Sequence, residues 1–123
     1  MKRTITILPE TEGATLCLSF RGTITAEDFT EFHEKPLLKI LESHDHYNLY
    51  VIYEDDFEGW SEDAAALSFK CISAISPKAR KAAYVNAPDS RHLLMKIVQP
   101  LTHLQVRYFE SGEEKEALDW IGE

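Results

Sequence analysis

The chain has 123 residues, and 13 basic against 21 acidic residues give it a formal net charge of −8. This length fits one domain spanning residues 1–123, and the 44% hydrophobic and 28% charged residues are typical of a globular protein. The acidic balance argues against general nucleic-acid binding, and no apolar run is long enough for a stable membrane anchor. Two cysteines are too few for a secreted disulfide framework, so we expect a cytoplasmic protein.

The first third of the chain predicts a strand hairpin followed by an irregular helix. Residues 4–8 (TITIL) and 15–20 (TLCLSF) form short β-rich runs around a glycine-containing turn, which favours an antiparallel pair. Thr25 fits the N-cap of an amphipathic helix. Pro36 lies inside that helix and removes a backbone hydrogen bond, so we expect a kink or a break near residues 34–35.

The rest of the chain alternates strands and helices, which predicts an α/β fold. Residues 48–53 (NLYVIY) are almost continuously apolar, as expected for a central strand buried on both faces. The further predicted elements are a helix capped by Ser61 and ended by Pro77, a strand at 81–85, a helix at 90–101, a strand at 104–109 and a terminal helix with Ser111 and Glu114 as its capping box. This order implies a mostly parallel sheet with an N-terminal antiparallel hairpin and helices on both faces.

Five stretches in order carry a family resemblance. They are residues 22–28 (GTITAED), 57–60 (FEGW), 81–85 (KAAYV), 106–109 (VRYF) and 116–121 (EALDWI). With them the chain resembles the SpoIIAA-like family, small bacterial proteins related to the STAS domains of anti-sigma-factor antagonists. The resemblance implies a βα superhelix of SpoIIAA (STAS) type and a non-enzymatic regulatory or protein-interaction module, without an assigned activity.

One departure from the antagonists concerns their phosphorylation switch. Those proteins carry an Asp-Ser-Ser-Gly-like segment where the third strand meets its helix, and a partner kinase phosphorylates a serine there. The corresponding residues 54–61 read EDDFEGWS, in which Ser61 is the only hydroxyl residue. We therefore do not carry the switch over to this chain.

The most unusual composition follows the predicted central strand, because six of the ten residues 54–63 are acidic. Open α/β sheets bind ligands at the carboxyl ends of their strands, where this loop begins. We therefore select as candidate ligand or partner contacts Asp55, Asp56, Phe57, Gly59, Trp60 and Ser61. A structural interpretation stays open beside this one, in which the carboxylates are solvated near a helix N-terminus and the aromatic rings pack on the sheet.

The sequence contains no motif for catalysis, phosphate binding or a metal. His44 and His46 offer two metal ligands without a third at a recognisable spacing, and a polar turn explains them better. Cys17 and Cys71 occupy apolar positions, where a thiol is a small hydrophobic group. We predict no catalytic residues, no metal and no cofactor; hydrolysis or isomerisation by paired carboxylates of the 54–58 loop is a third hypothesis that lacks a visible pocket.

Two other hypotheses, from different functional classes, precede this third one. The first is the interaction module with an unknown protein partner, and the alternative is a carrier or sensor of a small apolar or amphipathic, lipid-like ligand that uses the loop after the third strand. Met95 projects away from the apolar face of the predicted third helix and is a candidate self-association residue of a homodimer.

Overall fold

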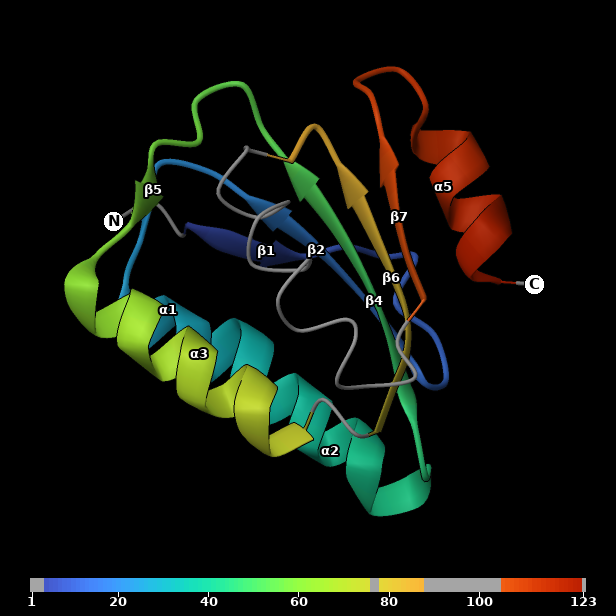
Figure 1. The fold of residues 1–123 in the computed structure, drawn as a ribbon, viewed down its shortest axis with the longest axis horizontal. Coiled ribbons are helices and arrows are strands. Elements are labelled where there is room, and N and C mark those ends of the chain that lie inside the picture. Colours follow the sequence, from blue (N-terminus) through green and yellow to red (C-terminus); the bar gives the residue numbers. More distant parts are fainter. Residues whose placement is uncertain (1–3, 76–77, 88–104, 123) are drawn as a thin grey trace.

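The computed structural model describes residues 4–75, 78–87 and 105–122 (Figure 1). Its elements follow one another as β1 (Ile5–Ile7), β2 (Thr15–Phe20), β3 (Thr23–Ile24), α1 (Ala26–Phe29), the π-helical segment η1 (Thr30–Glu34), α2 (Lys35–Ser43), β4 (Tyr47–Tyr53), β5 (Gly59–Trp60), α3 (Glu62–Ile75), β6 (Ala79–Val85), β7 (Gln105–Phe109) and α5 (Glu114–Ile121). The predicted helix at 90–101, with Met95, lies outside the described residues.

The main sheet has five strands in the order β1-β2-β4-β6-β7. Strand β1 pairs antiparallel with β2, and the pairs β2–β4, β4–β6 and β6–β7 are parallel, which confirms the predicted sheet and the central place of β4. Two short strands were not predicted: β3 and β5 form a parallel pair of their own. They follow β2 and β4, so this pair prolongs the same two chain segments beyond the main sheet.

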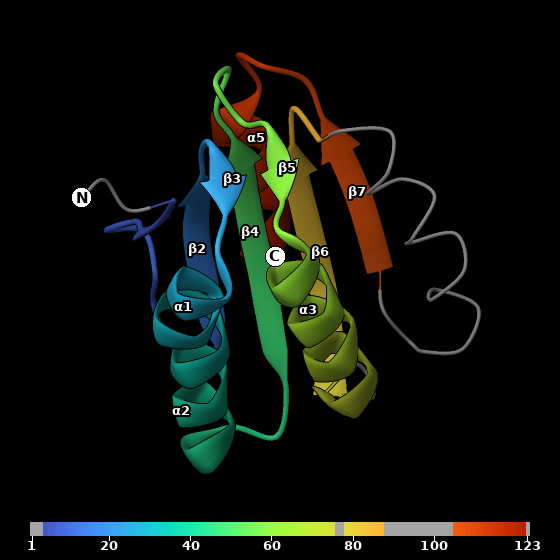
Figure 2. The same cartoon turned by 90° about the vertical axis from the view of Figure 1, so that its left-hand side faces the viewer.

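Helices cover both faces of the sheet, as predicted (Figure 2). Helices α1 to α3 lie on one face, where the alternate β2 residues Leu16, Leu18 and Phe20 are buried in the larger apolar core. Helix α5 covers the other face, where Cys17 and Tyr50 pack in a second core with Ala117 and Ile121. The period-2 alternation of β2 therefore supplies residues to two separate cores.

The helix after β3 does not break at Pro36. Its N-cap is Thr25, as predicted, because the Thr25 side chain accepts the Asp28 backbone N–H at 3.2 Å. The helix continues from α1 through η1 into α2, and the Lys35 N–H donates to the Thr30 carbonyl five residues earlier. Because Pro36 has no N–H and its ring crowds the preceding turn, widening that turn into a π-helix accommodates it without a break.

The predicted capping box of the last helix is wrong. The residue preceding α5 is Glu113, and Ser111 is exposed in the turn before it. The carboxylate of Glu113 instead accepts the Glu110 backbone N–H at 2.7 Å, and that of Glu114 accepts the Gly112 N–H at 3.2 Å. The Glu114 carboxylate that a capping box would direct to the Ser111 N–H is therefore bonded to the Gly112 N–H instead. No helix of the described residues is both long and apolar enough to cross a membrane.

Candidate functional site

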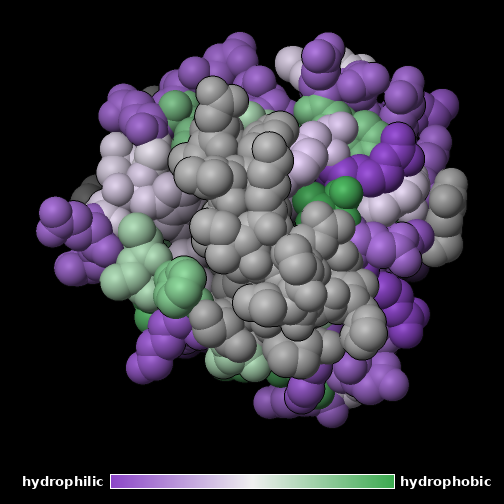
Figure 3. All heavy atoms as spheres, viewed as in Figure 1, coloured by the Kyte–Doolittle hydropathy of each residue, from purple (hydrophilic) through white to green (hydrophobic). Residues whose placement is uncertain are grey.

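The acidic loop runs beside the chain that links β2 to β3. In the main sheet Phe20 is opposite Tyr53, whereas in the short sheet Thr23 is opposite Gly59. Between these two pairs the β2 side has two residues and the β4 side has the five residues 54–58, so the three extra residues make this segment a bulging loop. This loop stands at the carboxyl edge of the parallel strands, where hydrophilic residues predominate in the space-filling view (Figure 3).

Three carboxylates of the loop each accept a hydrogen bond from a side chain 35 residues earlier in the chain. These contacts are Ser19 Oγ to Glu54 Oε2 at 2.9 Å, Arg21 Nη2 to Asp56 Oδ2 at 3.2 Å and Thr23 Oγ1 to Glu58 Oε2 at 3.3 Å. The first is partly buried and the other two are exposed. An exposed ion pair contributes little to stability, so these contacts orient the loop more than they stabilise the fold.

Backbone hydrogen bonds hold the same loop. The Glu54 N–H donates to the Phe20 carbonyl at 2.9 Å. Gly22 bonds in both directions, because its N–H donates to the Asp56 carbonyl at 3.1 Å and its carbonyl accepts the Glu58 N–H at 2.8 Å. Gly22 has φ +59°, a conformation that suits glycine. The loop is therefore a fixed extension of the sheet, with the Asp55 and Asp56 side chains exposed on it.

Two aromatic residues, Phe57 of the loop and Trp60 of β5, turn toward the core. Phe20 is 1% exposed and lies at the centre of their contacts. The Trp60 ring meets Phe20 edge-on with centroids 5.5 Å apart, and meets Phe29 at 5.9 Å. Phe57 packs edge-on against Tyr53 at 4.9 Å. Both rings remain partly exposed, but they pack against the aromatic core, whereas the carboxylates make the outer surface of the loop.

Gly59 and Ser61 have clear structural roles. Gly59 has φ +136°, which side-chain-bearing residues rarely adopt, and this allows the chain to enter β5 directly after the loop. Ser61 caps α3 as predicted, since its Oγ accepts the Ala64 N–H at 3.1 Å, and its own N–H donates to the Ile24 carbonyl at 2.9 Å. Glu62 and Asp63 follow it in the first turn of α3, so an added phosphoryl group would meet like charges.

The next parallel strand also ends in a fixed polar residue, which the sequence interpretation missed. Asn86 follows β6 with φ 58°, and its Nδ2 donates to the Tyr53 carbonyl at 3.0 Å. Its N–H donates to the Phe109 carbonyl at 2.9 Å. Asparagine tolerates this left-handed conformation better than most residues, which is the signal that sequence alone offered.

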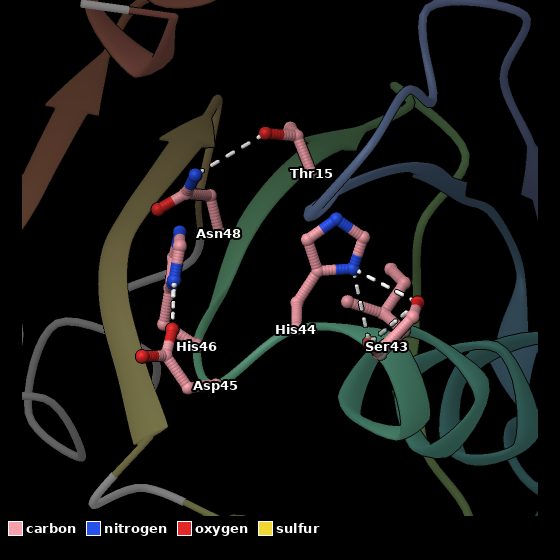
Figure 4. Close-up of polar contacts among 7 residues, drawn as sticks. Thr15, Ser43, His44, Asp45, His46 and Asn48 are labelled. Carbon is pink, nitrogen blue, oxygen red and sulfur yellow. Dashed lines mark hydrogen bonds and ion pairs between the residues drawn. The ribbon is translucent and has the colours of Figure 1, made fainter.

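His44 and His46 do not converge on one point. Figure 4 shows their rings on different sides of the chain that leads into β4. The Nδ1 of His44 lies 3.2 Å from the Ile40 carbonyl at the end of α2, whereas the Nδ1 of His46 lies 2.8 Å from the Asp45 carboxylate. Within the described ranges, no group of three or more His, Cys, Asp or Glu side chains is placed to hold a metal ion.

Both cysteines are buried and poorly suited to nucleophilic chemistry. Burial raises the pKa of Cys17 to about 11, and the nearby Glu10 carboxylate adds to this rise. Burial likewise raises the pKa of Cys71 to about 11, with a smaller contribution from Glu34. The thiolate is the reactive form, and it is scarce for both residues near neutral pH.

A search of curated proteins finds no match. An uncharacterized protein from Shewanella loihica PV-4 with a SpoIIAA-like fold has a crystal structure that matches with a TM-score of 0.70 and 20% sequence identity, over 95% of this chain and 93% of that chain. The SpoIIAA-like family model matches residues 15–122. The chain therefore belongs to the SpoIIAA-like family.

Proposed function

We propose that this protein is a non-enzymatic regulatory or protein-interaction module that contacts a partner protein through the acidic loop of residues 54–58. The observation that carries the proposal is the attachment of this loop to the β2–β3 segment by three side-chain contacts and by the backbone bonds of Gly22. A loop held in one conformation loses little entropy when a partner binds. Its exposed carboxylates favour a basic partner surface.

The chemistry of the described residues supports a non-enzymatic role. Both thiols have raised pKa values, and the partly exposed rings of Phe57 and Trp60 pack on the core. The loop carboxylates on Glu54, Asp56 and Glu58 are each engaged by a hydroxyl or a guanidinium group. A paired-carboxylate mechanism needs two acids in contrasting environments within one pocket, and this arrangement offers instead a row of separate contacts.

Asp55→Lys tests this proposal. Asp55 is exposed, so its replacement reverses a charge without removing packing. Partners captured from a lysate of the host by the wild-type protein are identified, and the affinity of each purified partner is then measured. We expect Asp55→Lys to weaken the binding of the true partner by about tenfold or more, which corresponds to about 1.4 kcal/mol.

The matched control is Glu116→Lys, because Glu116 is also exposed but lies on α5, across the sheet. We expect it to leave the affinity within about twofold of wild type, a change of about 0.4 kcal/mol. Equal losses in both variants would show a response to net charge alone. Equal affinity of Asp55→Lys and wild type would place the contact elsewhere and refute the proposed surface.

A second function, carriage of a small apolar or amphipathic ligand, has one observation in its favour, at a different place from the loop after β4 that the sequence analysis selected. A cavity of about 320 Å³ lies between the β1–β2 hairpin and α2, away from the acidic loop, and its apolar lining includes Ile7, Leu16 and Ile40. Mass spectrometry of the protein from its own host, first native and then denatured, tests this function. This function is supported if the wild-type protein carries a small molecule that is lost on denaturation and that is absent from the Ile40→Trp variant, in which the cavity is filled. It is refuted if the native wild-type protein has the mass of the chain alone.

A further inference from the structure

A second cavity lies on the opposite face of the sheet, beside α5. Its volume is about 390 Å³. One wall is the loop between β1 and β2 with the start of β2, and the other is the C-terminal half of α5. The first wall contributes Glu10, Glu12, Thr15 and Cys17, and the second contributes Leu118 and Ile121. We call this cavity the α5 groove.

The loop wall of the α5 groove is held by its own hydrogen bonds. The Thr11 hydroxyl accepts the Cys17 N–H at 2.9 Å and donates to the Cys17 carbonyl at 3.2 Å. Glu12 and Thr15 exchange backbone bonds of 3.0 and 2.9 Å around Gly13, whose φ of +56° suits glycine. The backbone that carries the two glutamates of the groove is therefore fixed before any ligand arrives.

The charge around the α5 groove is negative. Two carboxylates stand on its loop wall, whereas the Lys81 ammonium donates to the Trp120 carbonyl in the last turn of α5 and offsets the partial negative charge of that helix end. Two basic residues of this sheet face, Lys81 and Arg107, lie over the Trp120 ring and are not among the residues that line the groove. Lys81 Nζ is 5.1 Å from the centre of the Trp120 ring and donates to its carbonyl at 3.2 Å, and the Arg107 guanidinium is 5.5 Å from that ring.

Two buried groups on β2 and β4 have pKa values raised first by burial and then by nearby carboxylates, of which Glu10 lines the groove. Cys17 faces Tyr50 in the sheet, and both side chains lie under α5. Burial raises the pKa of Tyr50 to about 12, and the carboxylates of Glu114, Glu10 and Glu54 contribute to the rise. Burial and then Glu10 raise the pKa of Cys17. Nearby negative charge disfavours ionisation of both groups, as it would favour a bound cation.

The shape and the charge of the α5 groove together select a ligand class. Leu118 and Ile121 offer an apolar wall opposite the carboxylates of Glu10 and Glu12. These two carboxylates are too few for a metal site, whereas an ammonium group needs only one or two anionic acceptors. We propose that the α5 groove binds a small organic ammonium ion, with its charged end at Glu10 and Glu12 and a short apolar body against Leu118 and Ile121. This site is separate from the acidic loop of the proposed function.

Titration with butylammonium chloride, followed by backbone amide NMR signals, tests this proposal. We expect saturable shifts at Thr15, Cys17 and Gly122, and none at Ala64, which lies on the other face of the sheet. Sodium butyrate has a body of similar size with the opposite charge, and we expect no saturable shift from it. An absence of saturation by butylammonium at millimolar concentrations, or equal binding of butyrate, would overturn the proposal.

Two sets of variants separate charge from packing. Glu10→Gln/Glu12→Gln should weaken butylammonium binding by about tenfold or more, whereas the double control Glu27→Gln/Glu116→Gln, which removes the same charge from exposed positions elsewhere, should leave it within about twofold. Leu118→Ala should reduce the preference for butylammonium over methylammonium. Equal weakening by the two double variants would show that butylammonium binding depends on net charge alone. An unchanged preference in Leu118→Ala would show that Leu118 does not contact the ligand. Either result contradicts the site.

Discussion

Trp60→Ala distinguishes a core role of this residue from that of an exposed aromatic contact. Truncation of a buried tryptophan costs about 3–5 kcal/mol. Trp60 is partly exposed, but its ring contacts Phe20 at 5.5 Å and Phe29 at 5.9 Å, and aromatic pairs of this kind contribute about 0.5–1.5 kcal/mol beyond their buried area. We therefore expect Trp60→Ala to lower the free energy of unfolding by about 2–3 kcal/mol, somewhat less than full burial would give.

The chain offers a matched control in Trp120→Ala. Trp120 is also partly buried, and it packs against the second core with the cations of Lys81 and Arg107 over its ring. Each cation over an aromatic ring contributes about 0.5–1 kcal/mol at an exposed site, so we expect a loss of similar size, about 2–3 kcal/mol. A tryptophan that served only to contact a ligand would instead cost less than Trp120 when truncated.

Urea unfolding followed by far-UV circular dichroism measures both variants, because it does not depend on the fluorophore that each one lacks. In thermal unfolding, the same losses in free energy correspond to a fall in Tm of about 8–12 °C for a domain of this size. A loss below about 0.5 kcal/mol for Trp60→Ala, beside the full loss for Trp120→Ala, would refute the core role and favour the exposed aromatic contact.

Two further predictions concern buried thiols and a strained turn. The raised pKa values of Cys17 and Cys71, about 11 in the folded protein against 9.0 when exposed, predict a contribution of the thiols to stability that is fully present below about pH 9 and is lost as the pH rises toward 11, because only the unfolded chain ionises there. Urea midpoints at several pH values measure this, and rapid thiol labelling of the native protein at pH 8 would contradict it. For Asn86, with φ 58° and its Nδ2 bonded to the Tyr53 carbonyl, we expect Asn86→Ala to cost about 2–3 kcal/mol and Asn86→Gly about 1 kcal/mol less. Equal Tm values for these two variants would rule out backbone strain as the reason.

The sequence by itself determined the features that depend on neighbouring residues. The alternation of residues 15–20 and the apolar run of 48–53 correctly predicted β2 and the central β4, because side chains in a strand alternate between faces. Thr25 and Ser61 were identified as caps, since a cap bonds to a backbone group only three residues away. Family membership also follows from the sequence, as the match over residues 15–122 shows.

Only the tertiary structure decided how distant segments combine. The partners of the loop carboxylates, such as Arg21 for Asp56, lie 35 residues away and follow from the parallel pairing of β2 with β4. The α5 groove joins Glu12 to Ile121, which no local pattern connects. The turn before Pro36 became a π-helix rather than a break, because packing of Phe29 and Leu37 in one core favours a continuous helix over the local preference of proline.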